Sequence, residues 1–174
     1  MLRWPQMHPI LLRATMQTPV GAMIALTFDE GLCALEFDLP TRQSLLTARL
    51  RKWFTGYEME AMSDERKAPI VNWLAAYFQR DFPATPPLDL RGSAFERSVW
   101  QALIAIPPAR TTTYAKLAEA LGIPGSARAV GTAVRRNPIS LIVPCHRVVG
   151  SDGSLRGYGG GLPQKRWLLD HEAS

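Results

Sequence analysis

The sequence predicts an α+β protein, with an antiparallel β-meander and helices in its N-terminal part and a mainly helical C-terminal part. Short β-prone runs separated by Pro/Gly and Asp/Gly turns open the chain, and later apolar residues recur at helical spacing. The 174 residues suffice for one domain or two small ones. Because prolines stiffen a connection, we expect a boundary at Pro83–Pro87, between domains over residues 1–88 and 92–174.

Three strands are expected near the start of the chain. Each is a short run rich in β-branched and apolar residues that is bounded by a turn. The predicted strands are Ile10–Met16, Ala22–Phe28 and Leu32–Asp38, and the predicted turns are Thr18–Gly21 and Asp29–Gly31.

Helices are expected after the strands, because apolar residues then recur every three or four positions. The first two span Thr41–Phe54 and Ala68–Gln79, and the polar segment Thr55–Lys67 between them is predicted to be a loop. A third apolar stripe runs from Phe95 to Ile106, where two prolines end the helix.

The charge of the chain is uneven. Residues 1–90 hold 9 Lys/Arg and 10 Asp/Glu, a net charge of −1, whereas residues 91–174 hold 11 and 5, a net charge of +6. Such a basic half favours a polyanion such as nucleic acid, and a solvated basic face is the alternative. No apolar run is long enough to span a membrane, and the start of the chain lacks the apolar region of a cleaved leader. Two distant cysteines form no disulfide framework, so we expect a cytoplasmic protein.

A helix–turn–helix is predicted in the basic half. Tyr114–Leu121 forms a compact helix that Gly122 ends, and Ser126 is suited to cap a second helix, Ala127–Arg136.

The second helix carries small residues between two arginines. Arg128, Gly131, Thr132 and Arg135 share one face because of their spacing. Small residues let a backbone approach closely, which suits the DNA minor groove, about 6 Å wide, better than the major groove. An ordinary amphipathic helix with solvated arginines is the alternative.

Cys145 is the candidate nucleophile. It follows Ser140–Val143, which predicts a buried strand, and it precedes His146 and Arg147. A neighbouring imidazole and guanidinium lower a cysteine pKa and raise the thiolate fraction. A buried structural cysteine is the alternative, and we assign that role to Cys33, which has no neighbouring base.

A glycine-rich loop follows the candidate nucleophile. Its glycines, Gly157 and Gly159–Gly161, permit close backbone approach to a planar ligand, and Tyr158 offers a ring for stacking. A flexible loop tip is the alternative.

The last helix is predicted to begin at Leu162. Trp167 and Leu168 are expected to point inward, and Glu172 to share their side. A carboxylate at a helix C-terminus opposes the macrodipole, which indicates a task such as orienting a histidine. A frayed exposed end is the alternative.

The segment Pro144-Cys145-His146-Arg147-Val148-Val149 resembles the alkyl-acceptor signature of the O6-alkylguanine-DNA alkyltransferases, or methylated-DNA–protein-cysteine methyltransferases. Supporting motifs are Arg128–Gly131, Asn137-Pro138, Gly157-Tyr158 and Glu172. The close match covers about Phe95 to Glu172, and the meander fits loosely. The length resembles that of free-standing bacterial members. By this resemblance, the N-terminal domain is ribonuclease H-like and the C-terminal domain winged-helix-like.

The resemblance implies DNA repair by direct reversal. An alkyl group would move irreversibly from O6 of guanine, or O4 of thymine, to Cys145 itself, so that each molecule acts once. The implied partner is double-stranded DNA, bound through its minor groove with the damaged base flipped out. A monomer without cofactor or membrane association is expected. No metal is expected either, because His8 and Cys33 are the only His or Cys before residue 145.

The resemblance also implies roles for single residues. Cys145 would attack, His146 would take its proton through a water, and Glu172 would hold the imidazole. Tyr114 would rotate the phosphate and hydrogen-bond the departing oxygen, and Asn137 would tie the recognition helix to the active-site turn. The implied DNA contacts are Arg128, which fills the vacated stack, with Tyr114, Ala115, Ala127, Ala129, Gly131, Arg135 and Ser151. The implied pocket residues are Val134, Val148, Tyr158, Gly159 and Gly160.

Arg156 places a long side chain at the expected pocket edge, where we expect it to restrict bulky alkyl groups. Three other functions compete with alkyl transfer. A lesion-binding relative would lack the acceptor cysteine, whereas Cys145 is present. A Cys-His hydrolase would leave the arginine-flanked helix without a purpose, and a helix–turn–helix regulator would merely bury Cys145.

Overall fold

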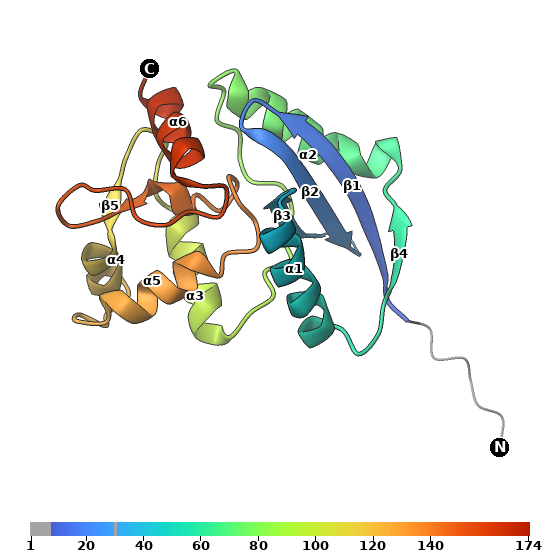
Figure 1. Cartoon of the computed structure of the whole chain (residues 1–174), viewed down its shortest axis with the longest axis horizontal. Helices are drawn as coiled ribbons and strands as arrows, with labels where there is room; N and C mark the ends of the chain where they lie inside the picture. The colour runs from blue at the N-terminus through green and yellow to red at the C-terminus, as the bar shows by residue number, and fades with distance from the viewer. Residues whose placement is uncertain (1–7, 30) are drawn as a thin grey trace.

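The computed structural model describes residues 8–29 and 31–174. The start of the chain, where no leader is expected, and residue 30 of the predicted Asp29–Gly31 turn lie outside the described residues. A four-stranded sheet with two helices lies beside a mainly helical region (Figure 1). This arrangement confirms the predicted α+β class.

The predicted meander is present and gains a fourth strand. β1 (Ile10–Thr18), β2 (Gly21–Phe28) and β3 (Gly31–Phe37) pair antiparallel. β4 (Glu58–Ala61) pairs parallel with β1, so the strand order is β3-β2-β1-β4. The prediction of a loop over residues 55–67 was therefore wrong. All four β4 residues are exposed, which is typical of an edge strand and leaves no alternating pattern to detect.

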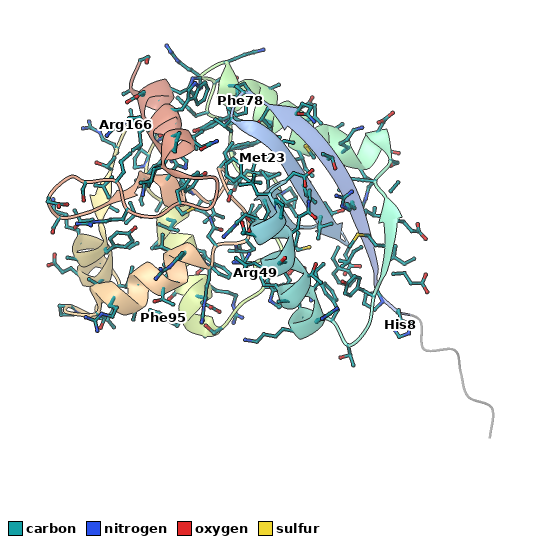
Figure 2. The ribbon with its side chains drawn as sticks, viewed as in Figure 1. His8, Met23, Arg49, Phe78, Phe95 and Arg166 are labelled. Atoms are coloured by element: carbon teal, nitrogen blue, oxygen red, sulfur yellow. The ribbon has the colours of Figure 1, made fainter. Side chains whose placement is uncertain are left out.

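Each face of the sheet packs against one helix. α1 (Pro40–Trp53) buries Leu46 and Leu50 in a cluster with Ile24 and Leu26 of β2. α2 (Asp64–Phe78) covers the other face, where Ile70 and Leu74 join the cluster of Met23 and Leu35. The labelled Met23 of β2 lies near the middle of the molecule in this view (Figure 2).

β3 joins the sheet to the helical region. The Leu35 N–H donates to the Pro138 carbonyl at 2.9 Å, and the Ser140 N–H donates to the Leu35 carbonyl at 2.7 Å. The segment Ser140–Val143 is buried as expected but forms turns rather than the predicted strand. Leu141 has a φ of 68°, which is incompatible with an extended strand.

The predicted helices of the helical region are present in the predicted order, and two short strands that the sequence did not indicate, β5 (Thr112–Thr113) and β6 (Val148–Val149), lie among them. The region consists of α3 (Ala94–Ile104), β5, α4 (Tyr114–Ala120), α5 (Ala127–Arg135), a 3₁₀ turn η1 (Cys145–Arg147), β6 and α6 (Leu162–Ala173). Within the described residues, no helix is long and apolar enough to cross a membrane.

Ser126 occupies the N-cap position of α5 as predicted, but its side chain makes no capping hydrogen bond because its ψ of 24° is not extended. One local prediction for the last helix was wrong. Trp167 is 40% exposed, whereas Leu168 is fully buried. The buried face of α6 contains Lys165, Leu168 and Glu172, and their three- and four-residue spacing turns Trp167 toward solvent.

Candidate active site

A cavity of about 370 Å³ lies between α4, α5, the glycine-rich loop and α1. Cys145 lines it, together with most of the small and aromatic residues that the sequence singled out. Its lining residues are Arg42, Tyr114, Ala127, Arg128, Gly131, Val134, Arg135, Asn137, Ser140, Cys145, Arg156, Gly157, Tyr158 and Gly159.

Two predicted pocket residues do not line this cavity. Val148 is fully buried, and Gly160 is buried against Phe37, where a Cβ would lie 2.5 Å from the phenyl ring. Three predicted DNA contacts also lie outside the cavity, on exposed surface: Ala115, Ala129 and Ser151.

The thiol of Cys145 is held by Asn137. The Asn137 Nδ2 lies 3.2 Å from the Cys145 sulfur and donates to the Val143 carbonyl at 2.8 Å. The Asn137 Oδ1 accepts from the Ile139 N–H at 2.9 Å. One buried amide therefore fixes both the sulfur and the turn before it.

The pKa of Cys145 differs from the sequence expectation. Burial raises it above the ordinary value, and the Asn137 hydrogen bond acts in the opposite direction. The prediction that Arg147 lies beside the thiol was wrong. The 3₁₀ turn directs the Arg147 guanidinium toward Glu172, where Nε lies 2.9 Å from Oε2 and Nη2 lies 2.8 Å from Oε1.

Glu172 accepts hydrogen bonds from three side chains and one backbone N–H. His146 Nε2 and the Tyr77 hydroxyl each lie 2.8 Å from Oε1, and the Ala109 N–H donates to Oε2 at 3.2 Å. Burial alone would raise the pKa of Glu172, but hydrogen bonds from His146 and Arg147 lower it to about 2. Glu172 is 6% exposed, which excludes the alternative of a frayed helix end.

These bonds determine the tautomer of His146. An ionised carboxylate only accepts hydrogen bonds, so His146 Nε2 carries a hydrogen. Burial lowers the pKa of His146, which favours the neutral ring with a lone pair on Nδ1. Nδ1 is buried and has no hydrogen-bond partner among the described residues. The imidazole is therefore arranged to accept a proton on the side opposite Glu172.

The sequence did not reveal a buried ion cluster that approaches the cavity from the N-terminal half. Glu36 accepts from Arg42 at 2.6 Å and from Arg49 at 2.7 Å. Arg42 lines the cavity, and Arg49 donates to the Arg136 carbonyl at the end of α5, 2.9 Å away. Glu36 lies 6 positions from Arg42 and 13 from Arg49, whereas the Arg49 contact with Arg136 spans 87 positions, so no single helical or strand spacing indicated the cluster.

Lys165 is a second residue of the site that was not predicted from the sequence. Its buried ammonium donates to the Val148 carbonyl at 2.6 Å and to the Arg156 carbonyl at 3.0 Å. It therefore ties β6 to the glycine-rich loop. Its spacing from Leu168 and Glu172 on one face of a helix was a signal that could have placed it inward.

The arginines of α5 are free of internal partners. Arg128 and Arg135 are exposed, and neither side chain has a hydrogen bond or ion pair with another described residue.

Cys33 is buried in β3, and its thiol donates to the Leu26 carbonyl at 3.3 Å. Burial raises the Cys33 pKa to about 12, which agrees with a structural role. The described residues contain no cluster of His, Cys, Asp or Glu that could hold a metal.

Comparisons with known proteins identify the family of the chain. Residues 94–174 match the model of the 6-O-methylguanine DNA methyltransferase, DNA binding domain. A methylated-DNA–protein-cysteine methyltransferase of Salmonella typhimurium is 40% identical over 167 residues, covering 93% of this chain and 95% of the relative. The chain belongs to the methylated-DNA–protein-cysteine methyltransferase family.

Other members of this methyltransferase family match over shorter or longer parts of the chain. The Mycobacterium bovis methylated-DNA–protein-cysteine methyltransferase is 50% identical over 105 residues, which span 60% of this chain and 64% of that relative. The crystal structure of a variant of the Mycobacterium tuberculosis O6-methylguanine methyltransferase superimposes with a TM-score of 0.80 at 37% identity. That superposition covers 94% of this chain and 93% of the other.

The M. tuberculosis methyltransferase has also been solved in complex with DNA. That structure has a TM-score of 0.77 and 36% identity to this chain, and it covers 94% of this chain and 92% of the other. The whole architecture described above, including the sheet, is therefore that of a methyltransferase of this family.

Proposed function

We propose that this chain repairs alkylated DNA by moving a methyl or other alkyl group from O6 of guanine, or O4 of thymine, to Cys145. The observation that carries the proposal is the position of the Cys145 thiol, in the wall of a cavity beneath α5 and bonded to Asn137. His146, with an unpartnered Nδ1, adjoins it in the chain. A nucleophile, a base and an orienting acid are the parts that covalent group transfer requires.

The transfer step follows from these groups. The Cys145 proton passes to His146 Nδ1, through a water, and the resulting thiolate attacks the alkyl carbon. A carbon–sulfur bond forms while the carbon–oxygen bond to the base breaks, and the electron pair of the broken bond leaves on the base oxygen. The base takes a proton from the Tyr114 hydroxyl, which solvent replaces, and the ionised Glu172 stabilises the imidazolium. The thioether has no facile leaving group, so one protein molecule repairs one lesion.

Tyr114 is suited to assist the departing oxygen. It lines the cavity, and burial raises the pKa of its hydroxyl, which keeps it protonated as a donor. Val134, Tyr158 and Gly159 would then surround the flipped base, because they line the same cavity.

The proposed partner is double-stranded DNA, held through its minor groove by α5. Arg128 and Arg135 are exposed cations, and Gly131 between them leaves the helix narrow. Arg128 would fill the gap left by the flipped base. Ala115, Ala129 and Ser151 are exposed and would contact the DNA backbone. The M. tuberculosis relative solved with DNA supports the same partner here.

We also propose the finer fold assignments and a cellular site. Residues 1–88 would form a ribonuclease H-like domain, and residues 92–174 a winged-helix-like domain, on either side of the proline-rich segment. The thiol must stay reduced to react, which supports a cytoplasmic location. We propose that the protein acts there as a monomer.

Intact-mass analysis tests the activity. The protein is incubated with a duplex oligonucleotide that contains O6-methylguanine, and a stoichiometric gain of one methyl group on the Cys145 peptide is expected. Cys145→Ala should gain nothing, whereas Cys33→Ser, the matched change at the structural cysteine, should gain the full amount. Binding without any gain would support a lesion-binding protein instead, and repeated turnover without modification would support a hydrolase.

A further inference from the structure

Tyr77 of α2 reaches the acidic residue of the candidate active site. Its hydroxyl donates to Glu172 Oε1 at 2.8 Å, across 95 positions of sequence. We propose that Tyr77 is a positioning residue for alkyl transfer, whose hydroxyl orients Glu172 and shares its negative charge. This inference rests on the proposed function. It gives the N-terminal half a direct part in the chemistry.

The hydroxyl can only act as a donor here. Burial, with the neighbouring Glu172, raises the pKa of Tyr77 far above its ordinary value, so it remains protonated. Glu172 is ionised and accepts at Oε1 from Tyr77, from His146 Nε2 and from Arg147 Nη2, each at 2.8 Å. Arg147 Nε lies 3.2 Å from the same oxygen, so donors from three residues divide its charge among them.

This sharing has a chemical consequence for His146. An imidazolium is stabilised in proportion to the charge that Glu172 presents to it. Because the Tyr77 hydroxyl takes part of that charge, the pKa of His146 is lower than it would be without the Tyr77 hydrogen bond to Glu172. His146 Nδ1 then stays free to accept the Cys145 proton at more acidic pH.

The ring of Tyr77 is held independently of its hydroxyl. It stacks on Trp73 with a centroid distance of 5.3 Å and meets the edges of Phe78 at 5.2 Å and Phe82 at 5.7 Å. Its backbone carbonyl also lies 3.1 Å from His171 Nε2, which joins α2 to α6 beside Glu172. A phenylalanine would fill the same space, so the hydroxyl can be removed without a cavity.

The competing explanation is a core tyrosine that simply satisfies its hydroxyl. The pair Tyr77→Phe and Phe82→Leu separates the two. Tyr77→Phe removes the hydroxyl and keeps the packing, whereas Phe82→Leu disturbs the packing and keeps the hydroxyl. Single-turnover transfer from a duplex containing O6-methylguanine is measured over a pH series for both variants, with affinity for unmodified duplex measured alongside.

We expect Tyr77→Phe to transfer methyl roughly tenfold more slowly, close to the smallest loss that corresponds to one hydrogen bond to a charged group. As the pH is lowered, the transfer rate of this variant should begin to fall at a higher pH than that of the wild type. Its affinity for unmodified duplex should be unchanged. Phe82→Leu should leave the pH profile in place. The inference would be overturned if Tyr77→Phe kept the wild-type transfer rate and pH dependence. It would also be overturned if both variants were slowed equally and neither changed the pH dependence.

A second variant guards against a folding defect. Incorporation of 3-fluorotyrosine at position 77 preserves shape and strengthens the donor, so the acidic limb of the profile should move to lower pH. No movement, or movement to higher pH, would count against the inference. Wild-type protein and Cys145→Ala are included in the same series. If the wild type gains no methyl group, the proposed function fails. If the wild type gains the methyl group but the changes at position 77 alter neither the rate nor its pH dependence, only this inference is refuted.

Discussion

The Asn137 side-chain amide lies 3.2 Å from the Cys145 sulfur, and the same nitrogen donates to the Val143 carbonyl at 2.8 Å. Asn137 follows directly after α5 and its cap, so the helix that carries Arg128 is coupled to the thiol through one buried side chain. It is also a group that lowers the Cys145 pKa, against the larger effect of burial.

Replacement of Asn137 should therefore weaken the nucleophile. Asn137→Asp keeps the oxygen that accepts from the Ile139 N–H but replaces the donor with a second oxygen. We expect the thiol pKa to rise, and the thiolate fraction at neutral pH to fall about tenfold for each unit of rise. The pH dependence of Cys145 alkylation by iodoacetamide measures this.

Asn137→Ala provides the comparison. It removes donor and acceptor together and leaves the buried Ile139 N–H unpaired, so it should cost roughly 1–3 kcal/mol of unfolding free energy. A thiol pKa in Asn137→Asp at or below that of the wild type would contradict the assigned role of Asn137.

The unfolding free energy should fall with acid in two steps. Burial depresses the pKa of His146 below its ordinary value of 6.5, so stability that is complete above pH 6.5 decreases as the pH falls below it. Burial opposes ionisation of Glu172, but its hydrogen bonds lower its pKa from 4.5 to about 2. That contribution, on the order of 3 kcal/mol, is complete above pH 4.5 and is lost toward pH 2.

Urea unfolding of wild type and Glu172→Gln over a pH series isolates the second step. The isosteric amide cannot ionise, so the difference between the two proteins should shrink as the pH falls from 4.5 toward 2. A constant difference over that range would show that Glu172 does not titrate as described.

Local sequence patterns predicted much of the fold. β1, β2 and β3 were recognisable from short hydrophobic runs between turns, and α4 and α5 from compact apolar stripes with a glycine between them. β4 was not recognisable, because all four of its residues are exposed and the strand exists only by pairing with β1. The apolar run Ser140–Val143 correctly indicated burial but not backbone shape, since a short buried run is compatible with a strand or a turn.

The site was predicted where its residues are neighbours in sequence or belong to one motif. Arg147 is next but one to Cys145 in the sequence, but it does not lie beside the thiol, because a 3₁₀ turn sends consecutive side chains in different directions. Tyr77 lies within the predicted helix Ala68–Gln79, but helical spacing can indicate only burial there and not a partner 95 positions away. The Cys145 pKa was predicted in the wrong direction for a related reason: desolvation depends on tertiary packing, which the sequence does not show.

Arg128 is expected to act on DNA and not on stability. It is exposed and has no partner among the described residues, so Arg128→Ala should change the unfolding free energy by less than about 0.5 kcal/mol. Transfer from duplex O6-methylguanine should slow strongly, whereas transfer from the free base O6-methylguanine, which has no duplex for Arg128 to contact, should not change.

Arg166→Ala is the matched control, because it removes the same charge from α6, well away from the α5 surface (Figure 2). It should leave transfer from both substrates unchanged. Equal slowing of the duplex reaction by both variants would reduce the role of Arg128 to its net charge.

Arg156 should limit the size of the transferred alkyl group. Its side chain lines the cavity, is 59% exposed, and is held by Asp152 at 3.2 Å. Arg156→Gly should therefore raise the rate of benzyl transfer relative to methyl transfer, measured as single-turnover rates on duplexes that carry either lesion. The Arg156 carbonyl that accepts from Lys165 is retained in this variant, so the loop keeps that anchor.

Arg156→Ala separates the effect of space from that of glycine flexibility, because it opens the cavity without freeing the backbone. It should raise the benzyl-to-methyl ratio to a similar extent, whereas Asp152→Asn, which keeps the long side chain and weakens only its restraint, should raise it less. Benzyl transfer that is already faster than methyl transfer in the wild type, and that slows further in Arg156→Gly, would show that Arg156 assists bulky groups instead of excluding them.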